Sequence, residues 1–141
     1  MIIKQLSVFL ENKTGRINEV TRILGESNIN MTAFSLAENA EFGILRMVVS
    51  DVALAVRVLK EAHFGVTETD VICFRCPNKP GALSVVLDYL AKEDIFIEYM
   101  YAFSDGETAN VVVRPTDIDK CIEILVRYKC DLLDSSELYQ V

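Results

Sequence analysis

Apolar and polar residues alternate along the chain in short blocks, and the period of the alternation changes from block to block. Residues 2–10 form a β-rich apolar run, which is typical of a strand. After Gly15, the residues Ile17, Val20 and Leu24 recur at the spacing of a helix face. The first half of the chain therefore predicts strands at 2–10, 28–36, 43–49 and 66–76, one helix after Gly15 and another at 51–62.

The same order of blocks returns later in the chain, in a constant register. Asn12 and Asn78 are 66 positions apart, and the register holds without a gap. It aligns Asn12, Lys13, Gly15, Val20, Leu24, Asp51 and Leu59 with Asn78, Lys79, Gly81, Val86, Leu90, Asp117 and Leu125. A shared period of this length indicates duplication of a whole small domain.

Each copy reads as strand, helix, strand, strand, helix, strand. In the second copy, strands are predicted at 95–103, 109–114 and 132–141, with a helix at 117–128. Hairpins are predicted at 38–43 and 104–107, and Asp51 and Asp117 are predicted helix N-caps. Right-handed crossovers place both helices on one face of an antiparallel sheet. We therefore expect an α+β fold of two tandem ferredoxin-like βαββαβ domains, at 1–69 and 70–141.

Composition narrows the class of protein. The chain has 141 residues, of which 51% are hydrophobic and 25% charged, as in a folded soluble protein. Its formal charge of -7 and its lack of a Lys/Arg stripe argue against nucleic-acid binding. It has no 18-residue apolar run and no recognisable signal peptide. We interpret its four cysteines as reduced thiols. We expect a cytoplasmic protein with no membrane span.

The repeated loops 12–15 and 78–81 are the main candidates for a function. Each carries a glycine before a predicted helix, whose first N–H groups lack intrahelical acceptors and suit a small anion or carboxylate. Asn12 and Asn78 add side-chain amides that both donate and accept. In the alternative interpretation, Gly15 and Gly81 only turn the chain from strand to helix.

The stretches ENKTGRINEVTRILGESNINM (11–31) and PNKPGALSVVLDYLAKEDIFI (77–97) resemble the ACT domain signature. In that signature, N-x-P-G-x-L precedes the first helix and NI-like residues open the second strand. The resemblance covers essentially the whole chain, as two consecutive ACT domains. ACT domains are regulatory modules that bind amino acids or other small metabolites, usually at an interface between two of them. The resemblance therefore implies no catalytic residues, no cofactor and no metal.

The resemblance also implies ligand-binding positions. In amino-acid-binding members, the loop asparagine and an asparagine at the start of the second strand hold the ligand, which gives Asn12 and Asn30 here. The second copy matches at Asn78 but has Phe96 at the other position, so the two sites are expected to be unequal. Thr14 stands where proline is usual, and Leu10 where some members carry histidine. The predicted ligand-binding residues are Asn12, Lys13, Thr14, Gly15, Arg16, Ile17, Asn30, Met31, Asn78, Lys79, Pro80, Gly81, Ala82 and Leu83.

Two other groups of residues invite weaker hypotheses. Cys73 and Cys76 are three apart on a predicted strand, so they face opposite sides, and we interpret them as buried thiols. His63, the single histidine, follows a predicted helix, where it is expected to cap carbonyls. Neither group assembles a catalytic or metal site.

Aromatic residues mark a candidate interface. Tyr99, Tyr101 and Phe103 alternate along one strand, and Phe34 and Leu36 lie on the matching strand of the first copy. The topology is also that of RNA-recognition domains, but the acidic charge and the missing basic-aromatic motif argue against RNA. We interpret these residues as an interface with a neighbouring sheet or a second chain.

The function predicted from sequence is that of a non-catalytic sensor of a small metabolite, most simply an amino acid. The ligand's carboxylate would meet the N–H groups of Thr14, Gly15 and Arg16. Output would pass through a homodimer, a higher homo-oligomer or a partner enzyme of amino-acid metabolism. The alternative is a ligand-independent regulatory subunit of such an enzyme. A small enzyme of acylphosphatase type shares the topology, but its Arg/Asn phosphate loop is not found.

Overall fold

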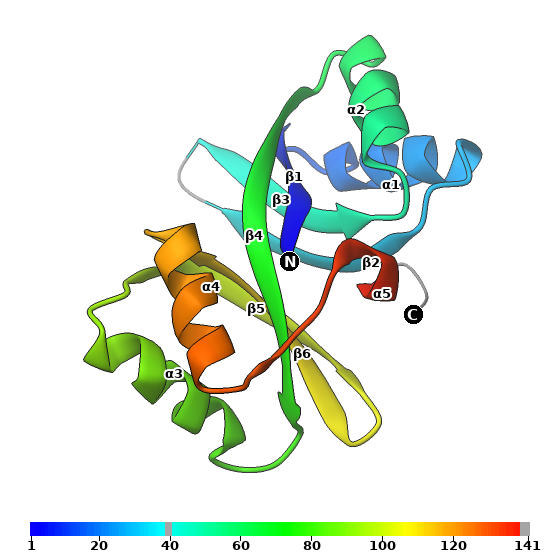
Figure 1. The fold of residues 1–141 in the computed structure, drawn as a ribbon. Coiled ribbons are helices and arrows are strands. Elements are labelled where there is room, and N and C mark those ends of the chain that lie inside the picture. Colours follow the sequence, from blue (N-terminus) through cyan, green and yellow to red (C-terminus); the bar gives the residue numbers. More distant parts are fainter. Residues whose placement is uncertain (39–40, 139–141) are drawn as a thin grey trace. The chain divides into compact units, whose positions relative to one another are not determined.

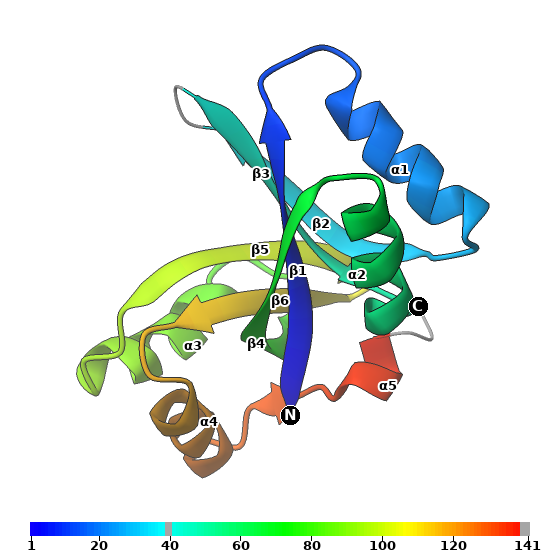
Figure 2. The ribbon, with the colours of Figure 1, turned by 90° about the horizontal axis from the view of Figure 1, so that it is seen from above.

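The computed structural model describes residues 1–38 and 41–138, which form seven strands and five helices (Figures 1 and 2). The chain divides into two compact units. The first module is Lys4–Thr69, and the second module is residues 70–138 together with Met1–Ile3. The pattern of the sequence did not indicate that Met1–Ile3 group with the second module. The predicted α+β fold of tandem βαββαβ units is confirmed.

The first module carries two helices and three strands of its own, and it shares a fourth strand with the second module. Its elements are β1 (Ile2–Glu11), α1 (Arg16–Glu26), β2 (Met31–Glu38), β3 (Phe42–Val49), α2 (Val52–Glu61) and the first part of β4 (Gly65–Pro77). The strand order is β2-β3-β1-β4. β3 pairs antiparallel with both β1 and β2, so β2 is the edge strand of this order.

The second module repeats this plan with one short strand. Its elements are the rest of β4, α3 (Ala82–Lys92), β5 (Ile97–Asp105), β6 (Thr108–Pro115), α4 (Ile118–Arg127), β7 (Asp131–Leu132) and α5 (Ser135–Leu138). The strand order is β7-β4-β6-β5, with antiparallel pairs throughout. The predicted hairpin at 104–107 is confirmed, with Gly106 at φ 65° in the turn. The predicted hairpin at 38–43 lies partly outside the described residues.

Each module has its own hydrophobic core between the sheet and its two long helices. In the first module, Leu45 and Met47 of β3 pack with Leu24 of α1 and Leu59 of α2. The second module uses β6, α3 and α4 in the same way. Both helices of a module therefore cover one face of its sheet, as the right-handed crossovers predict.

The helices begin and end in the same way in both modules. Asp51 accepts a hydrogen bond from the Leu54 N–H at 3.1 Å, and Asp117 accepts one from the Lys120 N–H at 3.0 Å, so both predicted N-caps are confirmed. At the C-terminal ends, four non-glycine residues adopt left-handed φ values of 57–68°, namely Asn28, His63, Asp94 and Lys129.

His63 illustrates this left-handed ending. Its N–H donates to the Lys60 carbonyl at 2.9 Å, and the Phe64 N–H donates to the Leu59 carbonyl at 3.0 Å. This pair of bonds is the Schellman arrangement, in which glycine is the usual left-handed residue. The backbone of His63 therefore makes the capping bond that the sequence analysis assigned to the imidazole.

The predicted strand at 132–141 is wrong for most of the residues that the structure describes there. β7 ends at Leu132, and Ser135–Leu138 form α5; residues 139–141 lie outside the described residues. The Asp134 carboxylate accepts from the Ser136 hydroxyl at 2.6 Å and from the Glu137 N–H at 3.2 Å. These bonds, led by that of Ser136, lower the pKa of Asp134. Asp-Ser-Ser-Glu is a helix-start signal, and its capping bonds favour a helical turn over a longer strand.

None of the helices within the described residues is long and apolar enough to cross a membrane.

Candidate functional site

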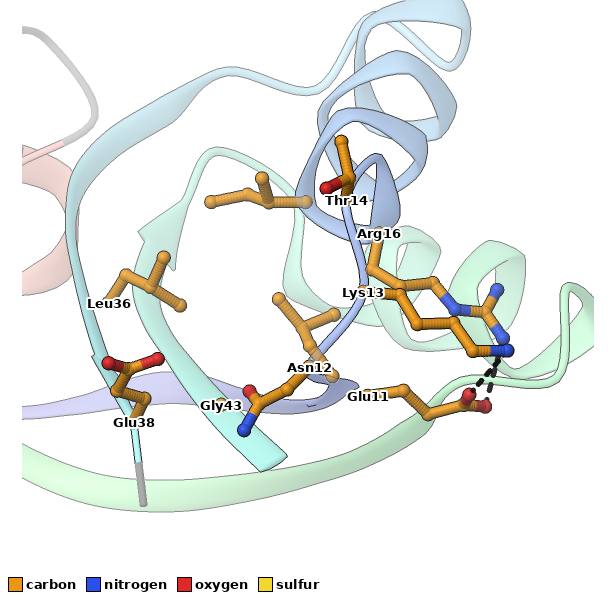
Figure 3. Close-up of a pocket in the computed structure, with 10 residues that line it drawn as sticks. Glu11, Asn12, Lys13, Thr14, Arg16, Leu36, Glu38 and Gly43 are labelled. Carbon is orange, nitrogen blue, oxygen red and sulfur yellow. Dashed lines mark hydrogen bonds and ion pairs between the residues drawn. The ribbon is translucent and has the colours of Figure 1, made fainter. Parts of the chain in front are cut away.

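A cavity of about 470 Å³ lies in the first module where β1 ends and the chain turns into α1 (Figure 3). It is lined by Leu10, Glu11, Asn12, Lys13, Thr14, Arg16, Ile17, Leu36, Glu38 and Gly43. Gly43 at the start of β3 pairs with Leu10 on one side and with Glu38 on the other. The cavity therefore sits at one end of the sheet, on the face that also carries the core.

The floor of the cavity is open because Gly43 has no side chain. A Cβ added there would lie 3.6 Å from Leu36 Cδ1 and 3.8 Å from the Asn12 side-chain oxygen Oδ1. These are ordinary contact distances, so a methyl group would fit but would occupy space between Leu36 and Asn12. Leu10, Ile17 and Leu36 give the cavity an apolar wall beside its polar residues.

The loop of the cavity offers backbone donors. Gly15 is the N-cap of α1, with a left-handed φ of 95° that suits glycine. The N–H of Arg16 donates to the Lys13 carbonyl at 3.3 Å, and that of Lys13 to the Glu11 carbonyl at 2.7 Å. Within residues 1–38 and 41–138, the N–H groups of Thr14 and Gly15 have no acceptor. Two donors at the start of a helix are thus not consumed by the fold.

Arg16 does not face the cavity with a free charge. Its guanidinium contacts Glu11 Oε1 at 2.9 Å and Glu19 Oε2 at 3.2 Å, and it lies 5.7 Å from the ring centroid of Phe64. Figure 3 shows the head groups of Arg16, Lys13 and Glu11 together, away from Leu36 and Glu38. The predicted pairing of Arg16 with a ligand carboxylate would have to compete with both glutamates.

The ion pairs of this cluster shift the pKa values of Glu11 and Arg16. Lys13 Nζ lies 3.2 Å from Glu11 Oε2. The hydrogen bond from Lys13, followed by that from Arg16, holds the pKa of the exposed Glu11 carboxyl below its usual value. Glu11 in turn raises the pKa of Arg16. Glu11 therefore has its counter-charges close by, in Lys13 and Arg16.

Asn30 and Met31 do not line the cavity. Asn30 donates its N–H to the Ser50 Oγ at 2.9 Å and accepts at its carbonyl from the Ser50 N–H at 3.0 Å. It precedes β2, whereas Leu36 lies near the other end of that strand. Six residues of strand span roughly 20 Å. One copy of the first module therefore does not bring Asn12 and Asn30 to the same ligand.

The second loop has the same backbone and a different setting. Gly81 caps α3 at φ 84°, and Ala82 N–H donates to the Lys79 carbonyl at 3.2 Å. Asn78 N–H donates to the Glu107 carbonyl at 2.8 Å, and Pro80 has no N–H. The second loop therefore lacks the donor that Thr14 supplies in the first. Leu83, the other predicted residue here, packs against the core of its module.

The sequence analysis missed five residues of the cavity as ligand contacts, of which Leu10 and Glu11 directly precede the loop in the chain. Leu36, Glu38 and Gly43 belong to β2 and β3, and only the pairing of these strands with each other and with β1 brings them to the loop. Because β1 and β2 run in parallel, both end at the edge of the sheet from which the loop leaves. That topological rule is the signal that could have indicated them.

Cys73 and Cys76 are buried thiols, as predicted, and Cys130 is partly buried. Cys73, Cys76 and Cys121 are buried, and Cys76 and Cys121 belong to the core of the second module. Burial raises the pKa of Cys73 to about 12 and that of Cys121 to about 11. Thiols with these pKa values are protonated and unreactive at neutral pH. Among the described residues, no three His, Cys, Asp or Glu side chains are placed to hold a metal ion.

The aromatic residues predicted as an interface do not share one face. Phe34 and Leu36, which are 58% and 54% exposed, pair with Met47 and Leu45 of the first core and lie on its side of the sheet. By the repeat, Phe34 corresponds to Met100. Tyr99, Tyr101 and Phe103 pair with Arg114, Val112 and Asn110 and point to the other side of their sheet. The matched surface that the sequence analysis grouped together is therefore two separate surfaces.

The chain matches the ACT domain pair family over residues 1–141 and belongs to that family. The crystal structure of a protein from Bacteroides thetaiotaomicron is 55% identical, with a TM-score of 0.96, over 100% of this chain and 98% of that one.

More distant structures share the fold. The regulatory subunit of aspartate kinase from Thermus thermophilus, in a ligand-free form, is 11% identical, with a TM-score of 0.65, over 90% of this chain and 94% of that one. That of Thermus flavus is 13% identical, with a TM-score of 0.64, over 90% and 92%. Among curated proteins, no sequence matches this chain.

Proposed function

We propose that this ACT domain pair is a non-catalytic regulatory protein whose first module binds an amino acid in the cavity beside loop 12–15. The ACT domains would be residues 1–69 and 70–141. Membership of the ACT domain pair family supports a regulatory role. The observation that carries the proposal is a cavity of about 470 Å³ whose lining includes Thr14, with its unused N–H, and the carboxylate of Glu38; the unused N–H of Gly15 is next to it in the loop.

The cavity fits the chemistry of a small metabolite. Its volume lies within the range of about 300–1,000 Å³ that is usual for ligand sites. The ligand's carboxylate would accept from the N–H groups of Thr14 and Gly15, where the positive end of the α1 dipole adds to the attraction. An apolar part of the ligand would lie against Leu10, Ile17 and Leu36.

The signal would arise from a change in assembly. Asn30 is too far from the cavity to touch the same ligand within one module, so the Asn12–Asn30 pair of the family would need a second copy of the chain. The exposed Phe34 and Leu36 on the edge strand β2 support such pairing. A ligand held between copies shifts their equilibrium only by binding one arrangement more tightly than another.

An alternative is a ligand-independent subunit that binds an enzyme of amino-acid metabolism. Apolar residues exposed on an edge strand favour this hypothesis too, because they suit a protein partner as well as a second copy. In that case the cavity would have no ligand of its own.

A thermal-shift panel of the twenty amino acids separates the two hypotheses. A ligand at ten times its dissociation constant stabilises the folded chain by about 1.4 kcal/mol, which raises the Tm by several degrees. Asn12→Ala should remove the shift, because its side chain lies at the cavity floor, and Asn78→Ala should leave it unchanged. Absence of any shift, together with a co-purifying enzyme, would favour the interaction subunit.

A further inference from the structure

Glu38 gives the cavity a charge that the fold does not balance. It is the last residue of β2 and pairs with Gly43, which in turn pairs with Leu10 on β1. Because Gly43 has no side chain, nothing on the middle strand separates Glu38 from Leu10 and the loop. Figure 3 shows the Glu38 carboxylate on the side of the cavity away from the Arg16 and Lys13 head groups.

The two acidic residues of the cavity differ in their partners. Glu11 is held by Lys13 at 3.2 Å and by Arg16 at 2.9 Å. Across the described parts of the chain, no Lys, Arg or His forms an ion pair with Glu38. A carboxylate without a counter-ion at the wall of a cavity attracts a cationic group, and a ligand that displaces water strengthens that attraction.

We infer, on the basis of the proposed function, that Glu38 is a specificity-determining residue, which requires the ligand to carry an ammonium group that pairs with its carboxylate. The N–H groups of Thr14 and Gly15 take the ligand's carboxylate, and Leu10, Ile17 and Leu36 contact an aliphatic part between the two charges. The ligand class is therefore an aliphatic amino acid. Its ammonium can be the α-amino group or the amine of a side chain, and these share the same chemistry.

Calorimetric titration with matched pairs of probes tests this inference and separates the two sources of the ammonium. L-leucine is compared with 4-methylpentanoate, which lacks the α-amino group. L-lysine is compared with L-norleucine, which lacks the side-chain amine. Each probe is titrated into the unaltered chain, Glu38→Gln and the control Glu61→Gln, an exposed change at the end of α2.

The inference predicts that L-leucine or L-lysine binds and that its matched probe without the ammonium binds at least ten-fold more weakly. Glu38→Gln should weaken the ammonium-bearing probe by about ten-fold and abolish the discrimination, because it removes a charge-assisted hydrogen bond. Glu61→Gln should change neither value.

Equal binding of both members of each pair, or full affinity in Glu38→Gln, would overturn the inference. If neither L-leucine nor L-lysine binds while another of the twenty amino acids does, the inference falls and the proposed function stands. If none of the twenty binds, both fall.

Discussion

Gly15 adopts φ 95° before α1 in the first module, and Gly81 adopts φ 84° before α3 in the second, so the two loops start their helices in the same way. The side chains around the two loops differ. At the positions of Glu11, Thr14, Arg16, Glu38 and Gly43, the second module has Pro77, Pro80, Ala82, Ser104 and Ala109.

The five replacements all change the surroundings of the loop in ways that disfavour a charged ligand. Each replacement in the second module removes a charge, removes an N–H donor or adds a side chain at the floor. The repeated loop by itself therefore connects a strand to a helix in both modules, and the neighbouring strands give the two loops different surroundings. Duplication has kept the scaffold in both modules, whereas the charged groups and the extra N–H donor beside the loop occur only in the first.

The largest expected effect tests whether the two scaffolds are equivalent. Leu24 and Leu90 are matched core residues of α1 and α3, and both are buried. Leu→Ala at either position should lower the free energy of unfolding by about 3 kcal/mol, because it leaves a cavity in the core. Denaturant melts measure this loss. Only Leu24→Ala should also weaken amino-acid binding, because Leu24 lies in α1, the helix that begins beside the cavity. An equal loss of binding in Leu90→Ala would contradict the assignment of the site to the first module.

The second prediction exchanges the residues that separate the loops. Thr14→Pro removes one N–H donor from the cavity while keeping a residue that the second loop tolerates at this position, as Pro80 shows. Binding should weaken by about 2 kcal/mol, the range for a hydrogen bond to a charged group, with little change in the melting temperature. Calorimetry measures the affinity. Pro80→Thr is the matched control and should leave the affinity unchanged.

A smaller effect concerns the helix ends, where the modules should respond alike. His63 and Lys129 hold left-handed backbone at φ 68° and 58°. His63→Gly and Lys129→Gly should each raise the free energy of unfolding by about 0.5–1 kcal/mol, because glycine removes the Cβ penalty of this conformation. Thermal melts provide the test. A loss of stability in either variant would show that the side chain contributes more than the backbone strain.

The smallest effect is the pH dependence of the charged loop. The folded-state pKa of Glu11 lies below its ordinary value of 4.5, so its contribution to stability is present above that value and is lost as the pH falls through the folded-state pKa. Lys13→Ala should move the Glu11 titration midpoint upward, since the hydrogen bond from Lys13 is its largest cause. NMR of the Glu11 side-chain carbon reports the midpoint. An unchanged midpoint would show that Lys13 does not lower the pKa of Glu11.

Much of the fold could be predicted from the sequence because its signals are local and repeated. The spacing of Ile17, Val20 and Leu24 fixes a helix face, and Asp51 and Asp117 mark helix starts through their own backbone bonds. The register of 66 positions then doubles every such signal. Helix α5 (Ser135–Leu138) was not predicted, because its start signal, Asp134, acts only on the next three residues and the surrounding apolar pattern also suits a strand.

The site could be predicted only in part. Asn12, Thr14 and Ile17 are found from the loop alone, because the motif carries them. Glu38 and Gly43 reach the cavity through strand pairing, and the pairing of Arg16 with Glu11 and Glu19 depends on side-chain geometry. A single sequence contains no local pattern for either. The separation of Asn12 from Asn30 likewise follows from opposite ends of a sheet rather than from their spacing.

The stoichiometry of amino-acid binding to the full chain tests most directly whether the first module alone holds a ligand; it is measured by calorimetry with the amino acid that gives the largest thermal shift. We expect one ligand per chain, with binding abolished by Asn12→Ala and retained in Asn78→Ala. Two ligands per chain, or binding that survives Asn12→Ala and is lost in Asn78→Ala, would contradict it.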